Sequence, residues 1–421
     1  MNVTIKPNKL SGTIQIPPSK SLSHRAIIAA ALAEGESVIS NVLYSKDILA
    51  TIDAMRACGA EIKEYSDHLV IHGSKVKRVQ SVINANESGS TIRFMIPIAL
   101  VSNEEIEFRG ENHLVKRPLD TFLEIFDSLG IKYTKGEDYL PLKVYSGLKC
   151  GTFKVRGDIS SQFITGLLYA LPLLDGDSKI VITTNLESKG YIDLTLDMLK
   201  KFGVEIENKE YKEFIIKGNQ SFKPYNYTIE GDFSQSAFFL VADALGADIK
   251  LSCMNMDSHQ GDKKILTDME DFGSNIIFEN DVLSLENKAL HGATIDFSQS
   301  PDLGPALTVL AALAEGESVF INAGRLRIKE CDRITAMRIE LEKMGAKIIE
   351  HKDGMTIYGV KELHGAIIDS HNDHSVAMAI AMASLRTKGD IKILNAGCVS
   401  KSFPNFFSVF ESLGGIVSYE D

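Results

Sequence analysis

Basic side chains in this chain of 421 residues gather where helices are expected to begin. The stretch "PSKSLSHR" (residues 18–25) puts Lys20, Ser21 and Arg25 at the start of an otherwise apolar helix. A helix N-terminus has unpaired N–H groups and the positive end of a dipole, so a cation there is unfavourable by about 0.3–1 kcal/mol. The basic residues at or near expected helix starts are Lys20, Arg25, Arg93, Lys116, Arg117, Lys189, Arg327, Lys329, Arg333 and Lys401.

An anionic ligand is the simplest explanation for this placement, since helix N-termini, Lys and Arg all bind phosphate and carboxylate groups. The formal net charge of −11 argues against broad binding of nucleic acid or of an anionic membrane surface. The attraction must therefore come from local clusters of basic residues. Any single one could still be an ordinary surface cation, and a single Ser or Asp at a helix start could be a cap.

Two acidic residues lie among these cations. Asp302 opens a helix in "SQSPDLG", and Glu330 lies between Lys329 and Arg333 in "RIKECDR". Carboxylates near cations stay ionised and can act as bases, although an N-cap or a structural ion pair would explain the same positions. The residues alone leave both interpretations open.

Metal and nucleotide-cofactor sites are not expected. His371 and His374 in "HNDH" have no matching His or Cys pair elsewhere in the chain. Neither the phosphate-binding pattern GxxxxGK[ST] nor the dinucleotide pattern GxGxxG occurs. The five cysteines show no CxxC spacing, which fits a reducing compartment. With no apolar leader and no apolar run long enough to span a bilayer, the sequence predicts a cytoplasmic protein, and we expect a monomer.

A repeat organises the chain. The segment "AALAEGESV" occurs at residues 30–38 and again at 311–319. A helical pattern closed by Gly and followed by a strand-like stretch recurs every 69–73 residues, at Gly59, Gly130, Gly203, Gly273, Gly345 and Gly414. Gly just after a helix adopts the left-handed C′ conformation without steric cost. Each unit is predicted to run strand, helix, strand, helix, strand, strand, so the fold class is α/β.

The two ends of the sequence are predicted to meet. The sixth copy stops at "GGIVSYED" without its last strand, and the N-terminal "NVTIKP" resembles that strand. Residues 1–14 with 228–421 would then form one lobe, and 15–227 would form the second, with "GTIQIPPSKS" as the first-strand equivalent. The alternative is a stray N-terminal strand that belongs to the first domain.

Motifs along essentially the whole chain resemble those of the 5-enolpyruvylshikimate-3-phosphate synthase family. They are "PSKSLSHRA", "GSTIRF", "KRPL", "SSQFITGLL", "SKGYIDLT", "PDLGPAL", "RIKECDRI", "NDHSVAMA" and "SKSFPNFF". The resemblance implies a two-lobed, inside-out α/β barrel of six βαβαββ repeats, three per lobe. It also implies an active site in the cleft between the lobes, where the helix N-termini would converge.

The implied reaction transfers the enolpyruvyl group of phosphoenolpyruvate to the 5-hydroxyl of shikimate 3-phosphate and releases phosphate. It proceeds by addition and elimination through a tetrahedral intermediate, without a metal or cofactor. The family acts in the shikimate pathway, which leads to chorismate and the aromatic amino acids, and it is the target of glyphosate.

The resemblance also implies the site residues. Those expected to bind shikimate 3-phosphate are Lys20, Ser21, Arg25, Ser160, Ser161, Gln162, Ser188, Tyr191, Asp302, Arg325 and Lys329. Those expected to bind phosphoenolpyruvate are Lys20, Gly89, Arg117, Gln162, Arg333 and Lys401. Asp302 is expected to handle the hydroxyl proton, and Glu330 and Lys20 are candidates for the proton at C3 of phosphoenolpyruvate.

The chain departs from the family pattern at three places. Ser375 stands where most members carry an Arg after the His of the "DH" motif, and Arg325 stands where some have an Asn. "ESGS" (residues 87–90) replaces "NAGT". Glu87 and Ser375 are near the glyphosate site of the family, so the sequence leaves sensitivity to that inhibitor open.

Two other functions compete with this interpretation. The related enolpyruvyl transferase that acts on UDP-N-acetylglucosamine uses a mobile loop with a reactive Cys, and the matching segment "GENHLVKRPL" has none. A catalytically silent anion-binding module on the same scaffold is the second. Retention of Asp302 and Glu330 argues against it.

Overall fold

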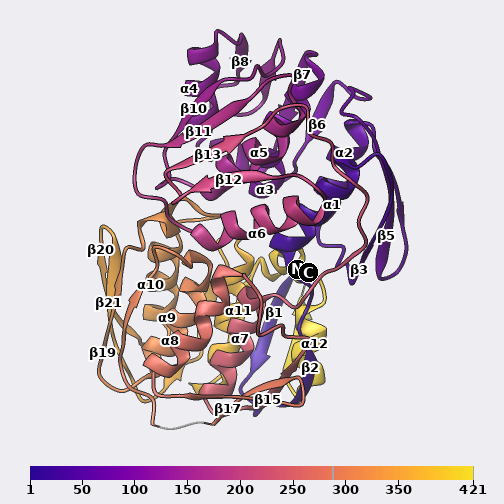
Figure 1. Ribbon diagram of the computed structural model, residues 1–421. Coiled ribbons are helices and arrows are strands. Elements are labelled where there is room, and N and C mark those ends of the chain that lie inside the picture. Colours follow the sequence, from indigo (N-terminus) through magenta and orange to yellow (C-terminus); the bar gives the residue numbers. More distant parts are fainter. Residues whose placement is uncertain (287–288, 421) are drawn as a thin grey trace. The chain divides into compact units, whose positions relative to one another are not determined.

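The computed structural model describes residues 1–286 and 289–420, and the chain divides into two compact units. Unit 1 consists of Met1–Pro17 and Glu230–Asp421, and unit 2 consists of Pro18–Ile229. Figure 1 shows the helices and strands of both. Within the described ranges, no helix has both the length and the apolar character needed to cross a membrane.

Unit 2 contains three sheets of four strands, with orders β14-β3-β5-β4, β6-β7-β9-β8 and β10-β11-β13-β12. Its strands are β3 (Gly35–Ser40), β4 (Glu61–Glu64), β5 (His68–Gly73), β6 (Val82–Asn84), β7 (Ile106–Arg109), β8 (Tyr133–Lys135), β9 (Leu142–Val144), β10 (Thr152–Val155), β11 (Ser178–Ile182), β12 (Ile206–Lys209), β13 (Glu213–Ile216) and β14 (Tyr227–Thr228). Its helices are α1 (Lys20–Leu32), α2 (Lys46–Ala57), α3 (Gly89–Ala99), α4 (Asp120–Leu129), α5 (Ser161–Ala170) and α6 (Lys189–Lys201), with short 3-10 helices η1 (Leu100–Ser102), η2 (Asn112–Lys116) and η3 (Leu171–Leu173).

Unit 1 repeats this plan with sheets β16-β17-β15-β2, β18-β19-β21-β20 and β23-β25-β1-β26, and a small pair β22-β24. Its strands are β1 (Asn2–Lys6), β2 (Ser11–Gln15), β15 (Asp248–Ser252), β16 (Asn275–Glu279), β17 (Val282–Glu286), β18 (Thr294–Asp296), β19 (Glu317–Ile321), β20 (Lys347–His351), β21 (Gly354–Tyr358), β22 (Leu363–His364), β23 (Ile367–Asp369), β24 (Thr387–Lys388), β25 (Ile391–Leu394) and β26 (Ile416–Glu420). Its helices are α7 (Phe233–Ala244), α8 (Ile265–Asp271), α9 (Gly304–Leu313), α10 (Arg333–Lys343), α11 (His374–Ala383) and α12 (Phe406–Ser412), with 3-10 helices η4 (Gly261–Lys264), η5 (Pro301–Leu303), η6 (Gly324–Ile328), η7 (Ser384–Arg386) and η8 (Ala396–Lys401).

The first helix of each repeat lies inside its unit. In unit 1, α7, α9 and α11 pack against one another, and every residue of α9 and α11 is buried. In unit 2, α3 packs against α5, and α1 packs against α2 and α6. Such helices are apolar on nearly all sides because no face meets water. Their polar residues are concentrated in the first turns.

The six predicted helix-ending glycines all have positive φ, between +66° at Gly130 and +106° at Gly59. These are backbone conformations that residues with a Cβ rarely adopt. The periodic glycines therefore mark the same turn in six repeats, as predicted.

The chain ends meet in one sheet of unit 1. β1 lies between β25 and β26 and runs antiparallel to both, with Val3 opposite Ile393 on one side and Tyr419 on the other. It occupies the place that β21 occupies in the fifth repeat. The prediction that the N-terminal strand completes the last repeat is confirmed.

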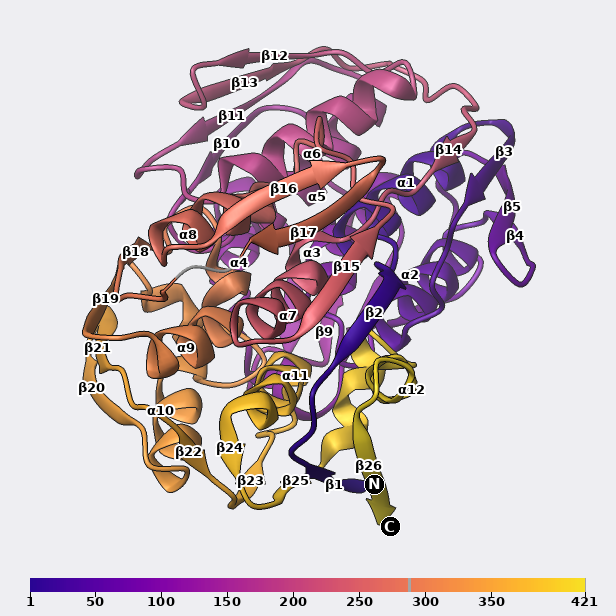
Figure 2. The ribbon, with the colours of Figure 1, turned by 90° about the horizontal axis from the view of Figure 1, so that it is seen from below.

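The prediction for the next strand was wrong. β2 is not the first strand of the first repeat, because it pairs in parallel with β15, in the sheet of the fourth repeat (Figure 2). The place beside β3 is taken by β14, which also pairs in parallel. The chain passes between the units at Pro17–Pro18 and again at Ile229–Glu230, so each crossing strand stays with the unit that the chain is leaving.

Candidate active site

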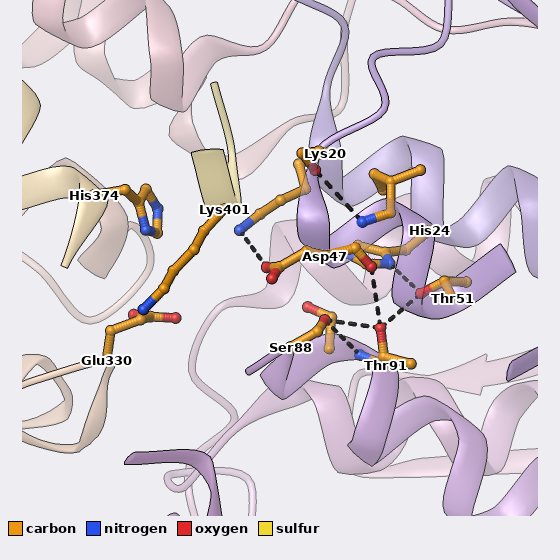
Figure 3. A network of polar contacts seen from close by, with 12 residues as sticks. Lys20, His24, Asp47, Thr51, Ser88, Thr91, Glu330, His374 and Lys401 are labelled. Atoms are coloured by element: carbon orange, nitrogen blue, oxygen red, sulfur yellow. Dashed lines mark hydrogen bonds and ion pairs between the residues drawn. The ribbon is translucent and has the colours of Figure 1, made fainter. Parts of the chain in front are cut away.

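In unit 2, α1 begins with the N-cap Ser19 and with Lys20, which forms an ion pair. Ser19 is the N-cap, and its side chain accepts a hydrogen bond from the backbone N–H of Leu22. Lys20 follows as the first helical residue, and its Nζ lies 3.0 Å from Oδ2 of Asp47 in the first turn of α2 (Figure 3). A carboxylate at the start of α2 thus partly offsets the repulsion that Lys20 experiences at the start of α1.

Arg25 is buried one turn further along α1 and joins it to two other helices. Its Nε donates to Oγ1 of Thr195 at 2.9 Å, its Nη1 to the carbonyl of Ser21 at 2.8 Å, and its Nη2 to the carbonyl of Tyr191 at 3.0 Å. Nη2 also lies 3.4 Å from Oγ1 of Thr165. Burial lowers the pKa of Arg25 to about 10, so the guanidinium remains charged at neutral pH. The expected residues Ser21, Arg25 and Tyr191 are therefore neighbours.

Gln162 is fixed at the start of α5 by three contacts. Its backbone N–H donates to the side chain of the N-cap Ser160. Its Oε1 accepts from Nη1 of Arg93 at 2.8 Å, and its Nε2 donates to Oγ of Ser90 at 2.9 Å. These bonds set which end of the amide faces which neighbour. Sequence reasoning named Arg93 as a cation but did not assign it this contact.

Ser161 and Ser188 also lie at helix starts. Ser161 is the first residue of α5, and Ser188 precedes α6 with φ +54°. Left-handed backbone is uncommon for a residue with a Cβ and is found mostly where surrounding structure imposes it. Both positions lie at helix starts, where backbone N–H groups without an intrahelical partner suit an anion.

Gly89, the first residue of α3, lies against Arg117. A Cβ built on Gly89 would be 2.4 Å from Nη1 of Arg117. No side chain fits between them without displacement of the guanidinium. Two residues expected at the phosphoenolpyruvate site are therefore in direct contact.

In unit 1, Arg333 is the centre of a buried ion-pair cluster. Its Nε and Nη2 donate to the two carboxylate oxygens of Asp373, at 2.7 and 3.2 Å. Nη1 donates to Asp302 at 3.0 Å, and Nη2 also reaches Glu330 and Oγ of Ser375, both at 3.0 Å. Arg333 is only 2% exposed. Asp373, which also caps α11, was missed as a separate residue although it lies in the quoted motif "NDHSVAMA".

The carboxyl group of Asp302 is held between two cations. Nζ of Lys329 lies 2.8 Å from the same oxygen that Arg333 contacts. Burial alone would raise the pKa of Asp302, but Lys329 and Arg333 outweigh burial and hold it well below its usual range. Burial also lowers the pKa of Lys329, an effect that Asp302 opposes. Asp302 and Glu330, the two acids expected to take part in the reaction, are therefore joined through one arginine.

Another expected site residue of unit 1 is Lys401, the last residue of η8. Its Nζ donates to the carbonyl of Asn372 at 2.7 Å, directly before Asp373. In Figure 3 the side chains of Lys401 and Glu330 point toward one another. Arg325 lies in η6, four residues before Lys329, and its charge contributes to lowering the pKa of Lys329.

Ser375 stands where most members of the family are expected to carry an arginine, and here its hydroxyl joins the ion-pair cluster around Arg333. Ser375 is buried at the start of α11, its N–H donates to Asp373, and its hydroxyl accepts from Arg333.

Within residues 1–286 and 289–420, no group of three or more His, Cys, Asp or Glu side chains is placed to hold a metal ion.

Fold and site together define a two-unit α/β protein whose helix starts carry paired cations and carboxylates. A family model described as EPSP synthase (3-phosphoshikimate 1-carboxyvinyltransferase) matches residues 4–410. A protein named 3-phosphoshikimate 1-carboxyvinyltransferase from Clostridium perfringens (strain ATCC 13124) is 52% identical over 421 residues, covering 99% of both chains. The relative of the same name from Clostridium novyi (strain NT) is 50% identical over 426 residues, covering 99% of this chain and 98% of its own.

Solved structures agree with this assignment. EPSP synthase from Acinetobacter baumannii matches with a TM-score of 0.81 and 27% sequence identity, covering 100% of both chains. The chain therefore belongs to the EPSP synthase family.

Proposed function

We propose that residues of both units bind phosphoenolpyruvate and shikimate 3-phosphate, the two substrates that the enzyme joins. As a member of the EPSP synthase family, the chain is a transferase of the shikimate pathway. It moves the enolpyruvyl group of phosphoenolpyruvate to the 5-hydroxyl of shikimate 3-phosphate and releases phosphate. The observation that carries the proposal is the cluster in which Asp302, Glu330, Lys329 and Arg333 meet.

We assign the site residues to the two substrates, and Lys20 and Gln162 are assigned to both. We assign shikimate 3-phosphate to Lys20, Ser21, Arg25, Ser160, Ser161, Gln162, Ser188, Tyr191, Asp302, Arg325 and Lys329. We assign phosphoenolpyruvate to Lys20, Gly89, Arg117, Gln162, Arg333 and Lys401. Both molecules carry several negative charges, and the cations with the helix N–H groups offset their mutual repulsion.

The reaction needs a proton removed from the 5-hydroxyl, a proton added at C3 and then removed again, and a proton supplied to the departing phosphate. The 5-hydroxyl oxygen adds to C2 of phosphoenolpyruvate and loses its proton, while C3 gains one. The tetrahedral intermediate then loses phosphate from C2 and a proton from C3, which restores the double bond. We assign the hydroxyl proton to Asp302 and the C3 proton to Glu330 or Lys20.

The ion pairs of Asp302 bear on its role as a base. A carboxylate whose pKa is held low by Lys329 and Arg333 is a weak proton acceptor. Phosphoenolpyruvate bound at Arg333 would compete for the guanidinium and so raise the pKa of Asp302. We infer that Asp302 becomes an effective base only when the second substrate is bound.

The two competing functions have less support. Relatives about 50% identical in sequence carry the shikimate enzyme's name, which favours that enzyme over the UDP-N-acetylglucosamine enzyme. A silent anion-binding module would not need three carboxylates against Arg333, because buried carboxylates weaken the binding of an anion.

Phosphate release provides the test. With phosphoenolpyruvate present, we expect release that depends on shikimate 3-phosphate and does not occur with UDP-N-acetylglucosamine in its place. Release with the UDP-sugar alone would support the rival enzyme. Absence of release with either acceptor, despite binding of both anions, would support the silent module.

We also propose that the enzyme works in the cytoplasm as a monomer. All five cysteines, including the exposed Cys150 and Cys253, are free thiols, which fits a reducing compartment. Sedimentation of the purified chain would give the mass of the species directly, to compare with 46.2 kDa.

A further inference from the structure

A buried chain of polar side chains joins the starts of three helices in unit 2 (Figure 3). Nδ1 of His24 in α1 lies 2.7 Å from Oγ1 of Thr51 in α2, which lies 2.7 Å from Oγ1 of Thr91 in α3. Thr91 Oγ1 in turn lies 2.8 Å from Oγ of Ser88, the N-cap of α3. All four side chains are at most 1% exposed. We call these four residues the α1–α3 relay.

The direction of the hydrogen bonds in the relay can be worked out because each hydroxyl group has only one proton to donate. The hydroxyl proton of Thr91 points to Ser88 Oγ or, more weakly, to the carbonyl of Asp47 at 3.4 Å, so it is not available to Thr51. Thr51 must then donate its own proton to Thr91. It can only accept from His24, and Nδ1 of His24 therefore carries the hydrogen.

His24 is a neutral imidazole at neutral pH. Burial, followed by the charges of Lys20 and Arg25, holds its pKa well below the usual value. Its Nε2 is buried and has no hydrogen-bond partner among residues 1–286 and 289–420. A buried polar atom without a partner is unfavourable, so an apolar residue at this position would cost less. The compensating effect is the link that Nδ1 makes to α2.

The far end of the relay lies at the phosphoenolpyruvate residues. Ser88 accepts two hydrogen bonds from Thr91, one from its backbone N–H and one from its hydroxyl, so the first turn of α3 is tied at two points. The next residue is Gly89, which lies against the guanidinium of Arg117. A shift of this turn would therefore move Gly89 and the guanidinium beside it.

We propose that Thr51 is a positioning residue for phosphoenolpyruvate: through the α1–α3 relay it holds Ser88 and Gly89 at a fixed distance from the start of α1. The side-chain hydrogen bonds of Thr51 run to His24 and Thr91, neither of which is an assigned ligand-binding residue. The inference rests on the proposed function, because it needs Gly89 and Arg117 to face phosphoenolpyruvate.

Substitution of Thr51 tests the relay in steady-state kinetics. Thr51→Val keeps the shape of the side chain and removes its hydroxyl, which separates His24 from Thr91. We expect KM for phosphoenolpyruvate to rise roughly three- to tenfold, the range expected for loss of a buried hydrogen bond. KM for shikimate 3-phosphate should stay within about twofold, because that ligand does not use Gly89 or Arg117. Thr51→Ser, which restores the hydroxyl, should return KM for phosphoenolpyruvate to near the wild-type value.

Thr387→Val is the matched control. Thr387 is also buried, and its hydroxyl donates only to the carbonyl of Ala383, away from every assigned residue. It should leave both KM values unchanged. An equal rise in both KM values in Thr51→Val, or no rise in either, would overturn the relay.

The ¹⁵N shifts of the imidazole provide a readout that does not depend on activity. In the wild-type protein, His24 should show a protonated Nδ1 and an unprotonated Nε2 from pH 6 to 9, and the Nδ1 shift should change in Thr51→Val. The opposite tautomer would overturn the inference. A wild-type enzyme without phosphate release that depends on shikimate 3-phosphate would instead count against the proposed function, so the two failures are distinguishable.

Discussion

At the scale of single residues, Arg333 shows how one side chain can organise a site. Its guanidinium donates to three carboxylates and one hydroxyl, and its geometry suits several acceptors at once. The sequence named Arg333, Asp302 and Glu330 as site residues, and the structure places them in one ion-pair cluster. The contact with Asp373 could not be predicted from the sequence, because Ser or Asp at a helix start is most often only a cap.

Substitution of Asp302 should separate chemistry from binding. In Asp302→Asn we expect kcat to fall by roughly a hundredfold or more, since the proposed base is lost, while shikimate 3-phosphate still binds. Asp296→Asn is a suitable control, because Asp296 lies six residues earlier and its carboxylate accepts from the backbone N–H of Ser298 and the side chain of Asn322. Near-normal turnover in Asp302→Asn would remove Asp302 from the reaction.

The ion pairs of Asp302 also predict a dependence of stability on pH. A carboxylate with a lowered folded-state pKa stabilises the fold above the unfolded pKa of about 3.9, and loses that effect as the pH falls through the folded value. The difference in unfolding free energy between the wild type and Asp302→Asn, measured in urea, should therefore shrink as the pH falls below about 4.

At the scale of elements, helix starts carry the site and neighbouring helices hold them in place. The repeat of glycines predicted where helices end, and the polar clusters predicted where they begin. Sequence could not show which helix starts touch, as with Lys20 and Asp47, because 27 residues and a strand separate the two. Pairing across helices depends on packing, which local patterns do not encode.

One such link joins α10 to the turn before α11. Glu340 in α10 is buried, and its carboxylate contacts Nε2 of His371 at 2.9 Å, Nζ of Lys343 and the backbone N–H of Asp369. The hydrogen bond with Glu340 raises the pKa of His371, an effect that burial and Lys343 oppose and Asp369 supports. The protonated imidazole thus stabilises the turn that also provides the carbonyl of Asn372 to Lys401.

His371→Gln should therefore destabilise the protein only at lower pH. A raised folded-state pKa contributes stability that is fully present below the unfolded value of about 6.5 and disappears as the pH rises through the folded value. The loss should stay below about 1 kcal/mol, because the His371 side chain is 32% exposed. Urea unfolding at pH 5.5 and pH 9 measures it, with Glu340→Gln as a partner variant that should show the same trend. A difference that is constant with pH would contradict this assignment.

At the scale of the whole molecule, two units of three repeats share one chain. The number of repeats and the return of the first strand to the last repeat could be predicted, because both leave periodic marks in the sequence. The placement of β2 beside β15 and of β14 beside β3 could not be predicted. Both are short strands of similar character, and their parallel partners, β15 and β3, are specified only by tertiary packing.

The position of β1 predicts a local effect. Ile5 is fully buried in the middle of its sheet, so Ile5→Ala should lower the unfolding free energy by about 2–4 kcal/mol. Hydrogen exchange should speed up first in β25 and β26, which pair with β1, while α1–α6 of unit 2 keep their protection. Lys6→Ala in the same strand is the control, because Lys6 is exposed. Faster exchange confined to unit 2 would show that β1 does not support this sheet.

The pairing of β1 with β26 has a topological consequence. Asn2 lies directly opposite Glu420 in antiparallel strands, an arrangement that a tight hairpin could bridge. A polypeptide ligated between these two residues would be a closed ring of six βαβαββ modules without termini. Circularly permuted forms, opened at any surface turn between modules, would then retain every strand pairing of the native topology.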